Sequence, residues 1–146
     1  MYVYRYLRYS FTGPPILRNK IKVPKKIKVY FVNKYYHPDI QIKLTKTLFK
    51  YTNTSIDISD GLIVDIEKMI NKQNLSYEIN IDDVPISNNL LNLIKKRKLD
   101  KSNLLSHGED YQILFTASPI KDKIIRHTAK NLGIQVHKIG QINSDT

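Results

Sequence analysis

The sequence predicts a small domain of the α/β or α+β class. Segments with helical periodicity alternate with short β-prone segments, in the order helix then strand four times between residue 38 and the end. Such an alternation is typical of helices packed on a sheet. The 146 residues are enough to bury one modest core.

Charge is concentrated in the first third of the chain. The net charge is +11, and residues 1–50 hold twelve lysines and arginines against one acid, whereas residues 51–146 hold twelve of each. Cysteine is absent, which excludes disulfides and thiolate metal sites. No apolar run is long enough for a membrane span or a secretory signal, so we expect a cytoplasmic protein.

Residues 1–28 predict a basic leader without a fixed fold. Tyrosines are interleaved with arginines, and Pro14-Pro15 and a lysine-rich run follow. Aromatic side chains beside cations can stack bases and contact phosphates, so an arm that binds nucleic acid is the alternative. No RNA-binding motif is present. We therefore place the folded domain at residues 29–146.

The segment before the central motif contains one predicted helix. Residues 29–37 are aromatic and β-prone. Pro38 suits the first turn of a helix. Apolar residues then recur at helical spacing, at Ile40, Leu44, Leu48 and Tyr51.

The stretch from Ser55 to Leu62 is the main candidate for a functional site. It places Asp57 and Asp60 three residues apart, with Ser59 between them and Gly61 after them. A strand end, a tight turn and a helix start would put both carboxylates on an exposed rim, beside free N–H groups of the helix N-terminus. Such oxygen ligands suit a magnesium–nucleotide complex. Alternatively, Ser59 or Asp60 is only the helix N-cap.

The remaining elements follow from local patterns. A helix is expected at residues 62–73, a strand at 77–81, a short helix at 90–94, a strand at 111–116, a helix from Pro119 to Gly133 and a strand at 134–142. The polar side of the helix at residues 62–73 is expected to carry Asp65, Glu67, Lys68 and Lys72. Asp82 and Asp83 precede a proline, which favours a solvated turn over a metal site.

A second polar loop, Ser106–Asp110, precedes the strand at 111–116. It contains His107, Gly108 and the adjacent acids Glu109 and Asp110. A carboxylate at a strand end can contact a substrate, but a polar turn is the alternative interpretation. The four histidines show no metal-ligand spacing, and we treat them as surface or packing residues.

Four motifs together resemble thiamine-monophosphate kinases. They occur in the family's order, as Ile56–Leu62, Asp83–Ser87, Ser106–Thr116 and Ile139–Ile142. The resemblance covers residues 54–143. It implies an α+β fold with helices packed on a mixed sheet, as in the C-terminal domain shared with aminoimidazole-ribonucleotide synthetases. It also implies transfer of the γ-phosphoryl group of ATP to thiamine monophosphate, giving thiamine diphosphate, with Mg²⁺ screening the charges.

The resemblance assigns a role to four residues. Asp57 and Asp60 match the family's magnesium-binding carboxylates, Ser59 matches a nucleotide contact and Glu109 matches a contact to the thiamine substrate. No covalent nucleophile is implied. The implied ligands are ATP as co-substrate, Mg²⁺ and thiamine monophosphate, and the family is homodimeric.

The sequence also departs from the family. Residues 1–28 show no resemblance, and stand where an ATP-binding domain is expected. No glycine-rich phosphate loop is present, and Asp39 and Lys43 replace a basic and a small residue. We therefore expect a fragment that is inactive alone, whose missing domain a separate chain could supply. The alternative is a non-catalytic basic module that contacts nucleic acid through residues 1–28.

Overall fold

The computed structural model describes most of the chain in seven stretches, which are residues 1–4, 15–18, 20–37, 46–47, 49–71, 73–97 and 112–144. The elements are β1 (Tyr2–Tyr4), α2 (Lys25–Tyr36), β2 (Thr54–Ile58), α4 (Leu62–Ile70), β3 (Leu75–Ile79), η1 (Ile81–Asp83), α5 (Asn88–Arg97), β4 (Gln112–Thr116), η2 (Pro119–Lys121), α7 (Asp122–Asn131), β5 (Val136–Lys138) and β6 (Gly140–Ser144). Helices and antiparallel strands together confirm the α+β class.

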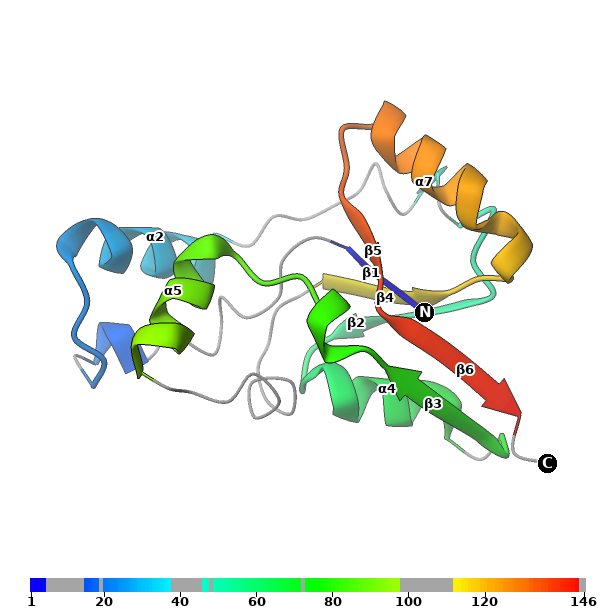
Figure 1. Ribbon diagram of the computed structural model, residues 1–146, viewed down its shortest axis with the longest axis horizontal. Coiled ribbons are helices and arrows are strands. Elements are labelled where there is room, and N and C mark those ends of the chain that lie inside the picture. The colour runs from blue at the N-terminus through cyan, green and yellow to red at the C-terminus, as the bar shows by residue number, and fades with distance from the viewer. Residues whose placement is uncertain are drawn as a thin grey trace.

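The strands form two sheets, which Figure 1 shows side by side. One has the order β2-β4-β1-β5 and the other pairs β3 with β6. All four pairings among the described strands are antiparallel, so these strands do not form the mixed sheet that the resemblance implied. β2 pairs with β4 along its whole length, and this register places Ile58 opposite Gln112.

The first strand corrects the expectation of a loose leader. β1 lies between β4 and β5, with Tyr2 opposite both Phe115 and Lys138. Met1, Tyr2 and Val3 are all buried. The partners of β1 follow more than a hundred residues later, so no local pattern near residue 2 reveals the pairing. Residues 5–14 lie outside the described residues.

α2 corrects a second expectation, because residues 29–36 are helical and not β-structured. Ile27 and Phe31 are four residues apart and share one helix face, and Phe31 is fully buried. That face packs with Ile16 and with residues of α5 in one apolar cluster. This packing outweighs the β-propensity of the aromatic residues. α2 and α5 lie together at one end of the molecule, away from the sheets (Figure 1).

Several elements match the sequence pattern with shifted ends. α4, β3, α5, β4 and α7 all form where helices and strands were expected. Gly133, at φ +66°, follows the end of α7. The expected last strand divides at Ile139 into β5 and β6, which belong to different sheets. Most of the helix expected from Pro38 falls outside the described residues, and residues 46–47 are helical. Within those residues, no helix is long and apolar enough to cross a membrane.

The four-stranded sheet is covered on both faces. Successive residues of a strand point to opposite faces, so Val3 and Leu114 join α4 in one apolar cluster. Tyr2 and Phe115 instead pack with Ile125 of α7. The rings of Tyr2 and Phe115 are stacked with centroids 5.2 Å apart. The first cluster lies directly beneath the junction of β2 and α4, and therefore supports the predicted site.

Candidate metal and nucleotide site

The site motif forms the predicted strand, turn and helix. β2 ends at Ile58 and α4 begins at Leu62, and Ser59–Gly61, here called the motif loop, connects them. At the end of the strand, Ile58 is fully buried and Asp57 is exposed. Asp60 is also exposed. The expectation that both carboxylates face solvent is met.

Gly61 makes the sharp entry into α4 possible. Its φ is +134°, a conformation that side-chain-bearing residues rarely adopt. The residue is buried, and its carbonyl accepts the first helical hydrogen bond, from the Asp65 amide at 2.9 Å. Gly61 therefore occupies the N-cap position, and no side-chain cap bond is made there. The interpretation of Ser59 or Asp60 as the N-cap is wrong.

The motif loop is instead held by Asp65, whose side chain is fully buried. Its Oδ2 accepts hydrogen bonds from three consecutive backbone amides, those of Ser59 at 2.8 Å, Asp60 at 3.0 Å and Gly61 at 3.2 Å. These loop amides are therefore engaged within the protein. The placement of Asp65 on a solvated polar side was wrong.

A signal for this role was present in the sequence. Leu62, Asp65, Ile66 and Met69 follow the spacing of one helix face, and all four are buried. A carboxylate in an apolar stripe must be paired or hydrogen-bonded to be stable there. Counting Asp65 within the stripe would have predicted a buried acceptor.

Lys68 links the buried carboxylate to the exposed one. Its Nζ donates to Asp65 Oδ1 at 2.8 Å, and it also donates to Asp60 Oδ2. Burial by itself would raise the pKa of Asp65, but the hydrogen bonds from Lys68 and from the loop amides outweigh this and lower it. Hydrogen bonds to Asp60 and Asp65 raise the pKa of Lys68. Asp65 is therefore a charged, fully occupied acceptor.

The donor set suits a magnesium ion shared with a nucleotide. Asp57 and Asp60 offer exposed carboxylates, and the described residues contain no group of three or more histidine, cysteine, aspartate or glutamate side chains placed to hold a metal. Mg²⁺ commonly keeps several waters and binds through one or two carboxylates plus substrate phosphates. The residues present fit that mode and do not form a closed protein cage.

The motif Ser106–Thr116 includes β4, which begins at the same edge of the sheet as the motif loop. Ser106–Asp110, including Glu109, lies outside the described residues. β4 begins at Gln112, which the register places opposite Ile58, the last residue of β2. The start of β4 therefore lies beside the motif loop.

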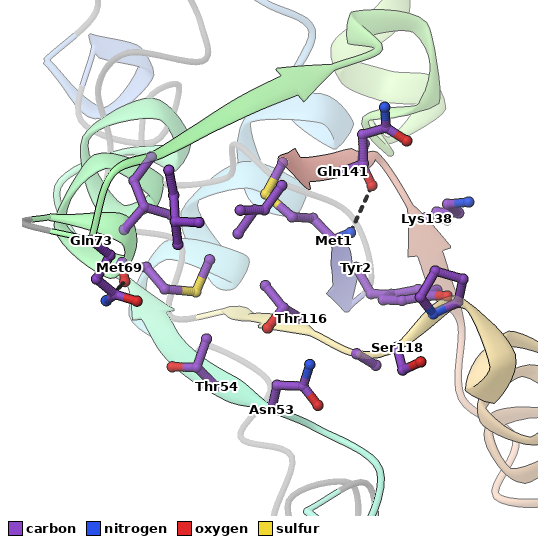
Figure 2. A pocket seen from close by; sticks show the side chains of 16 residues that line it. Met1, Tyr2, Asn53, Thr54, Met69, Gln73, Thr116, Ser118, Lys138 and Gln141 are labelled. Atoms are coloured by element: carbon purple, nitrogen blue, oxygen red, sulfur yellow. Dashed lines mark hydrogen bonds between the residues drawn. The ribbon is translucent and has the colours of Figure 1, made fainter. Parts of the chain in front are cut away.

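A separate cavity of about 490 Å³ lies between the two sheets (Figure 2). It was not predicted from the sequence. Asn53, Thr54, Thr116, Ser118 and Lys138 contribute polar groups to its wall. Thr54 begins β2 and Ile58 ends it, so the cavity and the motif loop are separated by roughly 13 Å of strand. The cavity is thus distinct from the carboxylate site.

Comparisons with known proteins point to one family. No protein-family model matches the sequence. Thiamine-monophosphate kinase of Haemophilus influenzae is 30% identical over 115 residues, which cover 79% of this chain and 35% of that protein. The crystal structure of thiamine-monophosphate kinase from Stenotrophomonas maltophilia matches with a TM-score of 0.85 at 20% identity, covering 98% of this chain and 46% of that one.

Two matching structures are of the thiamine-monophosphate kinase of Aquifex aeolicus, and one of them contains ligands. The Aquifex aeolicus kinase gives a TM-score of 0.81 at 26% identity, covering 98% of this chain. The same enzyme has been solved in complex with AMPPCP and TMP, and this chain covers 44% of it. The thiamine-monophosphate kinase of Buchnera aphidicola subsp. Schizaphis graminum is 31% identical over 148 residues, which cover 99% of this chain, so the expectation that residues 1–28 bear no resemblance to the family is wrong. The chain spans less than half the length of these proteins, and over the length it shares with them it belongs to the thiamine-monophosphate kinase family.

Proposed function

We propose that this chain provides the metal- and phosphate-binding part of a thiamine-monophosphate kinase. The reaction is transfer of the γ-phosphoryl group of ATP to thiamine monophosphate, which yields thiamine diphosphate. The observation that carries the proposal is the match to a relative solved with AMPPCP, an ATP analogue, and TMP. The exposed carboxylate pair at the β2–α4 junction supplies chemistry that fits this reaction.

The chain's own residues would divide the work of binding. Asp57 and Asp60 would hold Mg²⁺, Ser59 would contact the nucleotide and Glu109 would contact thiamine monophosphate. The metal, when bound, screens the repulsion between the two phosphate groups. The rigid loop fixed by Asp65 would keep the carboxylates in place, because phosphoryl transfer depends mainly on positioning and charge stabilisation.

The rest of the site is part of the same proposal. The matched segment is less than half of each relative, so the family's reaction involves further polypeptide. We expect the chain to bind divalent metal weakly by itself and to catalyse transfer only when the remaining part is supplied. A cytoplasmic location and assembly as a homodimer stay predictions.

The test measures thiamine diphosphate formed from ATP, Mg²⁺ and thiamine monophosphate. The purified chain is assayed with and without an added protein comprising the remaining part of a family member. Turnover only on mixing is expected, and Asp57→Asn should abolish it. Rapid turnover by the lone chain would contradict the need for a second part. No turnover in any mixture would count against the kinase proposal.

A second candidate function is binding of nucleic acid, and one observation favours it. Residues 15–37 and 86–97, here called the helical unit, contain no acidic residue. Seven cations of the unit are exposed, namely Arg18, Lys20, Lys22, Lys25, Lys26, Lys95 and Lys96. The helical unit also exposes Tyr35 and Tyr36. Cations with exposed aromatics suit a single-stranded polyanion.

Charge reversal tests this candidate. Lys25→Glu with Lys26→Glu should weaken binding of single-stranded RNA, and the affinity of the unaltered chain should fall steeply with salt. The control is Lys123→Glu with Lys130→Glu, which alters two exposed lysines of α7. Equal loss of RNA binding in both double variants would show that net charge, and not the helical unit, is responsible.

A further inference from the structure

The ammonium group of Lys68 stands between the two carboxylates of the site. It donates to Asp65 at 2.8 Å and also to Asp60, so one cation serves both groups. The two contacts differ in their surroundings. The Asp65 side chain is fully buried, whereas the side chain of Asp60 is 63% exposed and that of Lys68 is 44% exposed.

This difference decides which contact is permanent. Asp65 lies three residues before Lys68 on the same helix, and its other oxygen is fixed by three loop amides. Losing a partner of a buried carboxylate is costly. The contact with Asp60 is an exposed ion pair, and such pairs contribute little and open readily.

We infer that Lys68 is a built-in counter-ion of the motif loop, which neutralises Asp60 when no metal is bound and releases it when a divalent cation binds. This rests on the proposed function, in which Asp60 is a metal ligand. On release, Lys68 stays attached to Asp65. Lysine has three donors on one ammonium group. The N–H groups of Lys68 that no longer bond to Asp60 are then free to face the metal site.

The exchange has a defined consequence for affinity. The Lys68 ammonium on Oδ2 and a divalent cation compete for the negative charge of Asp60, so the ion pair weakens metal binding. Removing the competitor should therefore tighten metal binding. Exposed ion pairs are weak, so we expect an increase in affinity of only about two- to fivefold.

The experiment titrates the full chain with Mn²⁺ as a stand-in for Mg²⁺. Binding is followed by paramagnetic broadening of the backbone amide signals of the motif loop, which detects weak association without any catalytic readout. The variants are Lys68→Met, Asp60→Asn, their double variant and Asp57→Asn. Lys123→Met removes an exposed lysine of α7 and controls for net charge. Lys68→Arg keeps the charge at the site, and melting curves report whether each variant is folded.

The expected pattern is specific to the exchange. Lys68→Met should bind Mn²⁺ about two- to fivefold more tightly, Lys123→Met should match the unaltered chain, and Lys68→Arg should stay close to it. In the Asp60→Asn background, Lys68→Met should have no further effect, because the shared partner is gone.

The other outcomes separate the two proposals. If Asp60→Asn weakens Mn²⁺ binding but Lys68→Met does not tighten it, the counter-ion inference is overturned and the metal site stands. A gain that persists in the Asp60→Asn background also overturns it, since the effect would then be general electrostatics. If neither Asp57→Asn nor Asp60→Asn alters Mn²⁺ binding, or no Mn²⁺ binds, the proposed metal site and this inference fail together.

Discussion

The side chain of Asp65 makes four hydrogen bonds from a position with no solvent exposure. It joins the motif loop to α4 more directly than either exposed aspartate does. Asp57 and Asp60 carry the chemistry in our proposal, and Asp65 holds the backbone that presents them. A residue that binds nothing from outside can thus be indispensable to a binding site.

Asp65→Ala should destabilise the fold strongly. It leaves three loop amides and the Lys68 ammonium without their acceptor, and one unsatisfied buried donor costs about 1 to 3 kcal/mol. We expect a loss of roughly 3 kcal/mol or more in the free energy of unfolding, measured by urea denaturation. Glu67→Ala removes an exposed carboxylate of the same helix and should cost about 0.5 kcal/mol or less. Similar losses in both variants would contradict the assigned role.

Tyr2 should make stability depend on alkaline pH. Burial, and then the hydrogen bond that its hydroxyl donates to Asp122 at 2.8 Å, raise the pKa of Tyr2 to about 12. Below pH 10 the phenol is neutral in both states. Between pH 10 and 12 it ionises only in the unfolded state, so the unfolded state releases a proton and stability falls as pH rises.

The size of this effect can be bounded. A shift of this size corresponds to roughly 2 to 3 kcal/mol across the window. Tyr2→Phe should flatten the curve of unfolding free energy against pH. Tyr36→Phe, which alters a tyrosine that is 60% exposed, should leave the curve unchanged. A pH dependence that survives in Tyr2→Phe would show that another group produces it.

At the scale of elements, success from sequence depended on where the determining contacts lie. α4, β4 and α7 carry their own signals, because an apolar stripe or run is local to each. The exposed positions of Asp57 and Asp60 were predicted because the strand end, turn and helix start around them are also encoded locally. β1 and α2 were missed, because distant partners decide their conformation. The pairing of β6 with β3 depends likewise on a close approach that spacing cannot reveal.

Gly140 permits that close approach, and replacing it should separate β6 from β3. A Cβ at this position would lie 1.9 Å from the carbonyl oxygen of Glu78, which is backbone and cannot rotate away. Gly140→Ala should therefore cost roughly 2 kcal/mol or more. Gly133→Ala is the matched control: its φ of +66° is unfavourable but nothing lies within 4 Å, so about 1 to 2 kcal/mol is expected. A smaller loss at Gly140 than at Gly133 would contradict the pairing geometry.

At the scale of the whole molecule, the helical unit has its own apolar core, and it also carries most of the excess positive charge. Two apolar clusters cover the faces of the four-stranded sheet, and a third holds the helical unit together. The helical unit carries seven cations in residues 15–37 alone, without any acid. The cations up to Lys28 were expected to belong to a loose leader, because composition does not reveal that an apolar core holds them in a folded unit.

Two valines test where the folded core begins. Val3→Asp places a carboxylate without a partner at a fully buried position of the central strand, and should abolish cooperative unfolding. Val29→Asp makes the same change at a side chain that is 58% exposed on α2, and should leave the melting temperature nearly unchanged. Circular dichroism melting curves measure both. An unchanged melting curve for Val3→Asp would support the prediction that the first residues form a loose leader.

The central place of β1 also sets the order in which a growing chain can complete its fold. The Tyr2 hydroxyl meets Asp122, which is 120 positions further along, and both strands beside β1 come from the last third of the chain. During synthesis on the ribosome, the first residues must wait until that last third has emerged. Contacts of such long sequence separation slow folding. Until then both edges of β1 lack their partner strands. During this interval, association with other chains or binding by a chaperone can compete with folding.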